Sequence, residues 1–598
     1  MLEDSFSIAA TSMHKLRRRC NPGILVSSNS GKVSVARVGF NYLFEGPWPP
    51  QAPRWTKVLY FTQSRAIRFE PPASPIAETS VPHLSTVPSV PVRCLAVAAL
   101  VLLAGCALPS LRGRPTSLAL SNTADTSLGH AIAPTLAGHP RQTGIYPLRA
   151  GRDAFAARVL LAAAAERSID AQYYIWHDDA TGMLLFEAIC QAADRGVRVR
   201  LLLDDHSTED LDATMAALAA HRNVELRLFN PLRHRRARWL NYLLDFRRVN
   251  HRMHNKSFTI DNQVAVIGGR NIGDEYFQAG TEESFEDLDV IAVGPAVAEI
   301  SQEFDTYWNS ASAYPAQLLL GTSSSASTDS LLGSFEAARK ESASTRYLET
   351  LRETPLIKRL SAGRLDMQWS NSRLVYDDPA KVTDKNHPQQ LLLLSRLLDM
   401  TASPRNQFDL VSPYFVPGKG EQRLTKLATN GVRVRVLTNS LESTDTTVVH
   451  GGYRKYRKAL LRAGVSLYEK VRGSPSASSE RSQDKHHSSA TGLHAKTFQI
   501  DGRSVFVGSF NFDPRSARLN TEMGLLIDNP ILANRLSSFF DTQVSLLAYK
   551  LRLVRGNHIE WIKSTPQGTQ VYEHDPRTSF WRRVKVRIMS ILPIEWLL

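Results

Sequence analysis

A repeat of domain length constrains the fold of this chain more than any other feature of its sequence. The hexapeptide GVRVRL at residues 196–201 recurs as GVRVRV at residues 431–436. Both copies alternate aliphatic, mainly β-branched, residues with arginine, which is typical of a strand, and each follows a helix-like segment. A further strand-like segment precedes each of those helices, at residues 169–176 and 408–414. The chain is therefore expected to contain two similar halves.

The repeated order of strand, helix and strand predicts an α/β fold in each half. Parallel strands of one sheet are joined by right-handed crossovers, so the sheets should be largely parallel. We place the two halves at residues 140–320 and 346–560. The serine-rich residues 321–345 are predicted to link them, and the loose, charged residues 472–491 are predicted to lie on the surface.

Within this duplication, each half carries one copy of a motif of reactive residues. HNKSFTID begins at residue 254 and is followed by GGRN, while HAKTFQID begins at residue 494 and is followed by GSFN. Residues two apart on a strand face the same side, so the His and Lys of each copy can reach one ligand together. The motif residues are His254, Lys256, Asp261 and Asn271 in the first half, and His494, Lys496, Asp501 and Asn511 in the second.

The aspartates and asparagines of the motif have different expected positions. Asp261 and Asp501 have the opposite strand parity and precede turn-forming dipeptides, so we expect them at hairpin tips, where they stabilise turns. The glycines before Asn271 and Asn511 let the backbone approach a phosphate, to which the Asn amides can donate. We therefore predict that the two asparagines bind phosphate.

The two copies, HxKxxxxD followed by GGxN or GSxN, resemble the signature of the phospholipase D superfamily across residues 140–560. The resemblance implies two phospholipase D-like α/β domains with mixed sheets flanked by helices, related by a pseudo-twofold axis and sharing one active site. It also implies that the six His, Lys and Asp residues of the motifs are catalytic. Neither a metal nor a cofactor is expected.

The same resemblance implies an acidic residue that orients a catalytic imidazole. Glu522, in the sequence LNTEM, stands where the family has this acid in the second half. Aligning Leu525 with Val290 gives Asp287 as its counterpart in the first half. The alternative is that Asp287 is a solvated loop acid.

The residue types of the motif suit cleavage of a phosphodiester. Such an anion repels nucleophiles, so the site must supply cations, hydrogen-bond donors and a proton for the departing alkoxide. One histidine can attack phosphorus to form a phosphohistidine, while the other protonates the leaving alcohol and then activates the acceptor. The resemblance assigns the attack to His254 and proton transfer to His494, and either water or an alcohol can be the acceptor.

Residues 252–257, RMHNKS, and 268–277, GGRNIGDEYF, are most similar to bacterial cardiolipin synthases of the C type. This similarity implies a phosphatidyltransferase acting on phosphatidylglycerol, with phosphatidylethanolamine or cardiolipin as further phospholipid substrates. The alternatives are a hydrolysing phospholipase D, a phosphodiesterase such as a nuclease, or a lipoprotein that only binds. Complete motifs in both halves argue against binding alone, because a binding module needs no reactive pair of histidines.

The charge of the chain favours an anionic partner. The formal charge is +15, which suits either a membrane surface or nucleic acid. Residues 233–248 mix arginine with Trp, Tyr and Phe, and the C-terminal tail, residues 561–598, contains a similar basic and aromatic segment. Such segments suit an anionic bilayer interface, although they could also pack on the core. We expect a membrane partner and no nucleic acid.

The first part of the chain is expected to direct the protein to a membrane. Residues 1–91 lack a helical or strand period, which predicts a disordered leader or a start codon assigned too far upstream. Residues 92–106 resemble a lipoprotein signal with Cys106 as the lipidated residue; a short buried helix is the alternative. Ala107 then favours the outer membrane, so we expect a bacterial lipoprotein facing the periplasm. The cysteines lack CxxC spacing, which argues against a disulfide scaffold or a structural zinc site.

Overall fold

The computed structural model describes residues 108–598, except residues 281–282, 322–324, 363–364, 385–387, 474–489, 594 and 598. The predicted leader, the signal with Cys106, and Ala107 lie outside the described residues. From Pro109 onward, the described chain belongs to one structural unit.

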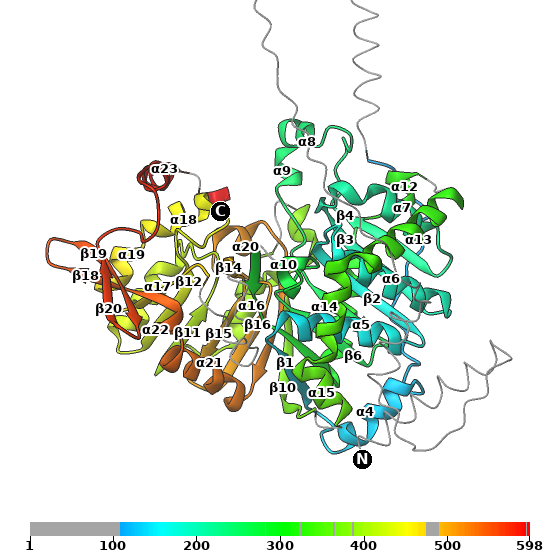
Figure 1. Ribbon diagram of the computed structural model, residues 1–598, viewed down its shortest axis with the longest axis horizontal. Coiled ribbons are helices and arrows are strands. Elements are labelled where there is room, and N and C mark those ends of the chain that lie inside the picture. Colours follow the sequence, from blue (N-terminus) through cyan, green and yellow to red (C-terminus); the bar gives the residue numbers. More distant parts are fainter. Residues whose placement is uncertain are drawn as a thin grey trace, which may run out of the picture. The chain divides into compact units, whose positions relative to one another are not determined.

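The first half is built on a mixed sheet flanked by helices (Figure 1). Strands β2, β3 and β4 are parallel, and the other strands join them in antiparallel pairs. Strands β2 and β3 are buried along most of their length, as expected of parallel strands covered on both faces. In spatial order the strands are β9 (Ala313–Pro315), β4 (Val224–Phe229), β3 (Arg198–Ser207), β2 (Ser168–Ile175), β5 (Ser257–Ile260), β6 (Val264–Gly268), β8 (Asp289–Val293) and β1 (Thr143–Leu148).

The second half repeats this order and adds an antiparallel extension. Strands β11, β12 and β13 are parallel, like β2, β3 and β4. Starting from the first half, the strands are β10 (Gln368–Tyr376), β17 (Met523–Asp528), β16 (Ser504–Gly508), β15 (Thr497–Ile500), β11 (Gln407–Val411), β12 (Arg433–Asn439), β13 (Ser466–Lys470), β18 (Ala548–Val554), β19 (His558–Thr565) and β20 (Gly568–Tyr572). The prediction of two similar α/β domains with mixed sheets is confirmed. The expectation of largely parallel sheets was wrong, because most neighbouring strands of each half pair in an antiparallel direction.

The halves meet through their sheets. Strand β1 pairs with β10 in an antiparallel register, which joins the two sheets edge to edge. Strands β6 and β8 also contact β16 and β17. Their buried aliphatic side chains form one shared core, which includes Ile267 and Val290 from the first half and Val507 and Leu525 from the second. Burial of this apolar surface stabilises the association of the halves.

Helices cover the outer faces of both sheets. Two of them occupy equivalent places: α11 (Pro295–Trp308) follows β8, and α21 (Pro530–Thr542) follows β17. Each begins with proline, whose fixed φ and missing N–H suit the first helical position. Other helices of the first half are α5 (Gly151–Ala164), α6 (Ala180–Asp194) and α7 (Asp212–Ala220), and α17 (Gly420–Thr429) and α18 (Thr447–Arg454) belong to the second.

The serine-rich connection is helical, which corrects our prediction of a loose linker at residues 321–345. Helix α13 (Ser325–Lys340) packs on α6 and α7, and α14 (Ser342–Arg352) follows it. Leu331 and Phe335, one helical turn apart, are buried, and this apolar contact outweighs the weak helix propensity of serine. Most of the second loose segment, residues 472–491, lies outside the described residues, but its end forms β14 (Ala490–Leu493), which pairs with β7 (Glu283–Glu286).

The C-terminal segment is structured beyond residue 560, the boundary we expected for the second domain. Trp561 on β19 is buried in the core of the second half. Helix α23 (Phe580–Ile591) packs on α18, and α8 (Trp239–Leu244) lies in the basic and aromatic segment of the first half. Among the described residues, no helix combines the length and apolar character needed to cross a bilayer.

Candidate active site

Hydrogen bonds to the opposite half hold the backbones of both motif histidines. His254 lies just before β5, and its N–H donates to the carbonyl oxygen of Thr521 at 2.9 Å. His494 lies just before β15, and its N–H donates to the carbonyl oxygen of Glu286 at 2.8 Å. Thr521 and Glu286 each stand directly before an acidic residue. These bonds therefore bring an acid of each half to the histidine of the other half.

The two acids orient the imidazoles crosswise. Nδ1 of His254 lies 2.8 Å from Oε2 of Glu522, and Nδ1 of His494 lies 2.5 Å from Oδ2 of Asp287. All four residues are buried. A carboxylate at Nδ1 favours the tautomer with its proton on that nitrogen, so that Nε2 carries the lone pair. Asp287 is thus placed as the counterpart of Glu522, in contact with a histidine rather than solvated.

The motif lysines lie beside the histidines. Nζ of Lys256 donates to the carbonyl oxygen of His254 at 2.6 Å, and Nζ of Lys496 donates to that of His494. Nζ of Lys496 also lies 2.8 Å from Nδ1 of His494. Both lysines are almost fully buried. Two cationic side chains are therefore enclosed with two imidazoles and only two orienting carboxylates.

Burial lowers the pKa of both imidazoles. The pKa of His254 falls to about 4, because burial disfavours its cation and both motif lysines repel it, despite the opposing charge of Glu522. Burial and the same two lysines also lower the pKa of His494. Since each lysine lowers the pKa of both histidines, the two motifs share one electrostatic environment. Both imidazoles are neutral near pH 7 in the ligand-free protein.

Burial and neighbouring charges act in opposite directions on the pKa values of the lysines and acids of the site. Burial lowers the pKa of Lys256 to about 7 and that of Lys496 to about 8. Burial would raise the pKa of both acids, but nearby cations outweigh it, so the pKa values of Asp287 and Glu522 are lowered. The acids are therefore ionised, and an anionic ligand between the lysines would favour their charged form.

Aromatic rings enclose the imidazoles, and these residues were not predicted from the sequence. The ring of Tyr174 meets that of His254 edge-on at 5.1 Å between centroids. Tyr276 meets His494 in the same way at 5.1 Å, and Phe285 lies 5.2 Å from His494. These contacts restrict rotation of the imidazoles. The sequence signal for Tyr276 was its place shortly after the GGRN motif; Tyr174, at the end of β2, has no such signal.

The motif aspartates lie away from the histidines. Asp261 accepts hydrogen bonds from the backbone N–H groups of residues 166–168, just before β2. Asp501 accepts from those of residues 405–407, just before β11. Both have positive φ, 50° and 52°, in the turns that follow β5 and β15. The structure therefore places them in turns at the far ends of the motif strands, which corrects their grouping with the catalytic residues.

The two motif asparagines differ in their partners. Oδ1 of Asn271 accepts from the N–H of Ile175 at 3.2 Å, and Nδ2 donates to the hydroxyl of Tyr276 at 3.0 Å. The side-chain oxygen of Asn511 is buried and has no hydrogen-bond partner within the described ranges. The side-chain oxygen of Asn511 therefore has no partner there, whereas the NH2 group of Asn271 donates one of its two N–H groups to Tyr276.

A buried polar cluster lies behind the first motif. Glu303 on α11 accepts hydrogen bonds from Nδ2 of Asn255 at 2.6 Å and from Nε2 of Gln172 at 2.5 Å. Asn255 in turn accepts from the hydroxyl of Thr521 at 3.0 Å. Burial raises the pKa of Glu303 to about 8. Its carboxyl group is therefore mainly protonated at pH 7, and the cluster links the first motif to the segment that carries Glu522.

A second cluster resembles a metal site but already contains a cation. His450, Glu469 and Asp575 bring potential ligand atoms close together. Nη2 of Arg457 lies 2.6 Å from Nε2 of His450, 2.8 Å from Glu469 and 3.0 Å from Asp575. The guanidinium group supplies the positive charge that a metal ion would bring. The cluster is a buried ion-pair network that supports the second half.

The sequence of this chain is similar to those of known proteins. The family described as "Cardiolipin synthase, PLD-like domain" matches residues 159–308 and 397–544, which contain the two motifs. Cardiolipin synthase C of Escherichia coli (strain K12) is 46% identical over 473 residues, which cover 79% of this chain and 99% of that protein. An uncharacterized protein of Helicobacter pylori (strain J99) is 31% identical over 484 residues, covering 78% and 92% of the two chains. Among solved structures, phosphatidylserine synthase of Haemophilus influenzae Rd KW20 matches with a TM-score of 0.47 and 13% identity, over 78% of this chain and 99% of that one.

Proposed function

The chain belongs to the family of cardiolipin synthases with phospholipase D-like domains, and we propose that it transfers phosphatidyl groups to make cardiolipin or a related phospholipid. The observation that carries this proposal is the pair of buried histidines, each oriented by an acid from the opposite half. Two such histidines with two lysines meet the needs of a two-step displacement at a phosphodiester. We assign the catalytic roles to the four His and Lys residues and the orienting roles to Asp287 and Glu522.

In the first step, Nε2 of His254 attacks phosphorus of the phosphatidyl donor, and a nitrogen–phosphorus bond replaces the bond to the leaving alcohol. His254 suits this role because its imidazole is neutral and Glu522 holds the Nδ1 proton. His494 donates a proton to the leaving alkoxide. An anionic donor raises the pKa of His494 from its lowered value in the empty site, because a negative charge favours the imidazolium form.

In the second step, His494 removes the proton from the acceptor hydroxyl. The acceptor oxygen forms a bond to phosphorus, and the bond to Nε2 of His254 breaks. Lys256 and Lys496 stabilise the negative charge on the non-bridging oxygens in both steps. With phosphatidylglycerol as donor and acceptor, the products are cardiolipin and glycerol; phosphatidylethanolamine as donor would release ethanolamine instead.

The proposal is tested with purified full-length protein and vesicles that contain phosphatidylglycerol. Cardiolipin and glycerol should form in equal amounts, and His254→Ala and His494→Ala should each abolish both products. Arg503→Glu, on an exposed turn, serves as a matched control and should keep full activity. Phosphatidic acid as the sole lipid product would identify the protein as a hydrolase and contradict transfer.

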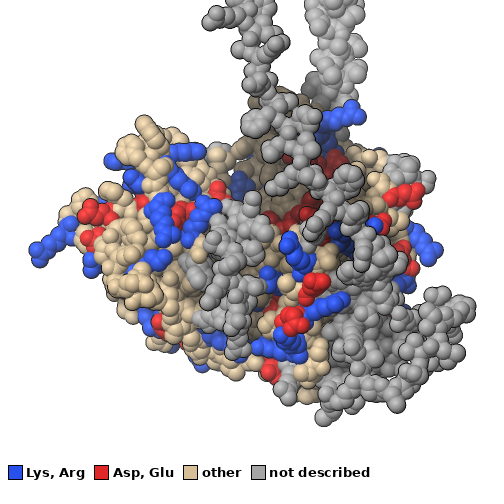
Figure 2. Space-filling model, in the orientation of Figure 1, with Lys and Arg blue, Asp and Glu red and all other residues tan. Residues whose placement is uncertain are grey.

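We propose that helices α8 and α23 hold this site against an anionic bilayer. Trp239 and Leu243 on α8 are 66% and 71% exposed, and Trp581 and Ile591 on α23 are 76% and 77% exposed. Both helices lie at the upper edge of Figure 1, and Figure 2 shows several Lys and Arg side chains around α18 and α23. Exposed aromatic and aliphatic side chains beside basic residues suit the headgroup region of a membrane.

Helix α8 is also connected to the first motif. The hydroxyl of Tyr242 lies 2.6 Å from Nδ1 of His206, and the ring of His206 stacks on that of Tyr174. Tyr174 contacts the imidazole of His254. A bilayer bound at α8 would therefore present lipid headgroups close to the site.

Vesicle binding tests this surface. The double variant Trp239→Ser, Trp581→Ser should bind phosphatidylglycerol vesicles at least tenfold more weakly than the unchanged protein. Binding should also weaken with added salt, because anionic lipids attract the basic side chains. Unchanged vesicle binding by this variant would show that other surfaces dock the membrane.

We propose, finally, that the protein is a lipoprotein anchored at Cys106 and facing the periplasm, in the outer membrane. The support is the apolar run and the small residues before Cys106 in the sequence, and Ala107 after it. Several acyl chains would give stable anchoring where one would be marginal. Mass spectrometry of the membrane-bound protein tests this: a peptide from upstream of Cys106, or normal anchoring of Cys106→Ser, would contradict it.

A further inference from the structure

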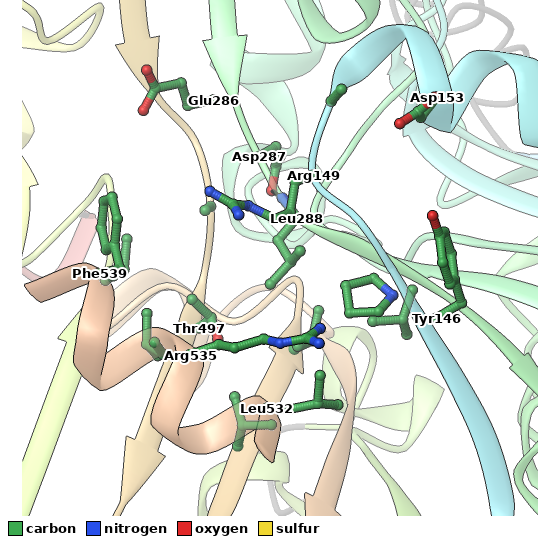
Figure 3. Close-up of a pocket in the computed structure, with 18 of the residues that line it drawn as sticks. Tyr146, Arg149, Asp153, Glu286, Asp287, Leu288, Thr497, Leu532, Arg535 and Phe539 are labelled. Carbon is green, nitrogen blue, oxygen red and sulfur yellow. Dashed lines mark hydrogen bonds between the residues drawn. The ribbon is translucent and has the colours of Figure 1, made fainter. Parts of the chain in front are cut away.

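The space behind the motif strand is filled in the first half and open in the second. In the first half it holds the hydrogen-bonded cluster of Gln172, Asn255 and Glu303. Behind the second motif, a cavity of about 1310 Å³ lies between the two halves and is lined by residues of both (Figure 3). The residues at the equivalent positions are Val411, Ala495 and Phe539, and all three line the cavity.

The strand registers establish two of these equivalences. Gln172 on β2 pairs with Ser257 on β5, and Val411 on β11 pairs with Thr497 on β15. Ser257 and Thr497 are both the fourth residue of their motif copies, while the second residues are Asn and Ala. A polar wall in the first half is thus replaced by an apolar wall in the second.

The helices establish the third equivalence. The guanidinium of Arg200 lies 4.8 Å from the ring centroid of Phe304 on α11, and that of Arg435 lies 4.9 Å from the ring centroid of Phe540 on α21. The two phenylalanines therefore hold the same place in their halves. The residues directly before them are Glu303 and Phe539.

The two halves also differ at the helix position four residues after Glu303 and Phe539. In the first half, the hydroxyl of Tyr307 on α11 donates to the carbonyl oxygen of Asp377 at 2.6 Å. Gln543 holds the place of Tyr307 by the same alignment and lines the cavity. Its side-chain oxygen is buried without a hydrogen-bond partner in the described part of the chain. Among the described residues, Gln543 does not form the hydrogen bond that Tyr307 makes in the first half.

The cavity combines apolar walls with two exposed arginines, Arg149 and Arg535. Figure 3 shows the guanidinium groups of Arg149 and Arg535 extending into the space from different elements. Within the described ranges, no carboxylate forms an ion pair with either group. Four acids also line the cavity: Glu286 binds Lys470 at 2.9 Å, Asp287 binds His494, Asp153 accepts from the N–H of Leu356 at 3.0 Å, and Asp366 is exposed. A third arginine of the lining, Arg359, donates to the hydroxyl of Tyr146 at 2.8 Å. The apolar walls include Leu288, Val290, Leu493, Val507 and Leu532.

We propose that this cavity binds an anionic amphiphile, with its hydrocarbon chain against the apolar walls and its acidic head between Arg149 and Arg535. The volume exceeds the ~300–1,000 Å³ of common small-molecule sites, so a long chain fits. Apolar walls favour burial of methylene groups, and unpaired guanidinium groups favour a carboxylate or a phosphate. Both a free fatty acid and an acidic phospholipid have this chemistry.

The site is separate from the reacting atoms. Ala495 and Thr497 line the cavity, whereas His494 and Lys496, which alternate with them along the chain, do not. A ligand in the cavity would not react, but it would pack behind Asp287, which also lines the cavity. Binding there would stabilise the contact between the two halves. This role goes beyond the proposed transfer reaction.

A fluorescent fatty acid, dansyl-undecanoate, tests the proposal with the full-length protein. The probe should bind with increased fluorescence, and the variant Arg149→Glu, Arg535→Glu should weaken its binding at least tenfold. Ser538→Trp, which adds a large side chain to the cavity wall, should also weaken it. Arg503→Glu matches the change of charge outside the cavity and should leave binding unchanged.

Further measurements separate this site from the others. His494→Ala and inorganic phosphate should not affect probe binding, because the cavity is separate from the active site. Trp581→Ser, which alters the proposed membrane surface, should not affect it either. Displacement of the probe by oleate or by dioctanoyl phosphatidic acid supports the proposal and identifies the source of the ligand. Displacement by neither, or unchanged affinity in both cavity variants, would overturn it. If the double arginine variant does not fold, Arg535→Ala on the exposed side of α21 replaces it.

Discussion

Nδ1 of His254 lies 2.8 Å from Oε2 of Glu522, although 268 residues separate them in the chain. The same relationship holds in the opposite direction between His494 and Asp287. Each motif histidine thus takes its carboxylate partner from the opposite half. The duplication in this chain has therefore produced one composite site rather than two independent sites.

Replacing Glu522 by Gln should lower kcat by about 10²–10⁴-fold with little change in Tm. The neutral amide no longer stabilises positive charge on His254, and the pKa of that imidazole should fall further below its value of about 4. The acidic limb of the pH–rate profile should shift to lower pH. Glu560→Gln, which removes an exposed ion pair with Arg552, is the control. Full activity in Glu522→Gln would contradict an orienting role.

The affinity for anionic phospholipid should fall as pH rises from 7 to 9. In the ligand-free protein the pKa of Lys256 is about 7 and that of Lys496 is about 8, so both lysines lose their charge in this range. The value of kcat/KM reports ionisation of the free enzyme and should decrease accordingly. Lys496→Arg should extend binding to higher pH, because arginine keeps its charge. A constant KM between pH 6 and pH 9 would count against these lysines as phosphate ligands.

Asp261→Ala should destabilise the protein by roughly 1–3 kcal/mol, because it leaves the backbone N–H groups of residues 166–168 without an acceptor. Asp501→Ala should have a smaller effect, since its turn is more exposed. Denaturant unfolding measures both changes. The folded fraction of each variant should retain transfer activity; a stable, folded and inactive Asp261→Ala protein would restore this residue to the catalytic group.

Glu303→Gln should increase stability at alkaline pH. The pKa of Glu303 is about 8 in the folded protein, against an ordinary value of 4.5. Between these values the folded state binds the proton more tightly, so stability falls as pH rises through about 8. Glutamine cannot ionise, and the variant should melt several degrees above the unchanged protein at pH 9 but near it at pH 5. Scanning calorimetry at both pH values checks this, and equal pH dependence of the two proteins would contradict it.

The local pattern of the sequence was sufficient to predict the main elements of the fold and site. Alternating residues in GVRVRL correctly indicated strands. The HxK spacing was also read as strand, but the His and Lys of both copies lie just before β5 and β15. Alternation along a strand involves near neighbours in the chain, so spacing alone reveals it. The duplication likewise predicted two similar α/β halves, because similar sequences form similar local structures.

Only the tertiary structure decided which partners meet across the halves. Glu522 and Asp287 reach the histidines of the opposite halves because the carbonyl oxygens of Thr521 and Glu286 accept hydrogen bonds from those histidines. No short-range pattern of the sequence encodes such contacts. The helix at Leu331 and Phe335 formed because other helices bury those side chains, despite the serines around them. Whether the space behind a motif is filled, as at Glu303, or open is likewise a matter of packing. Spacing determines where a side chain points, whereas the fold of the whole chain determines what it meets there.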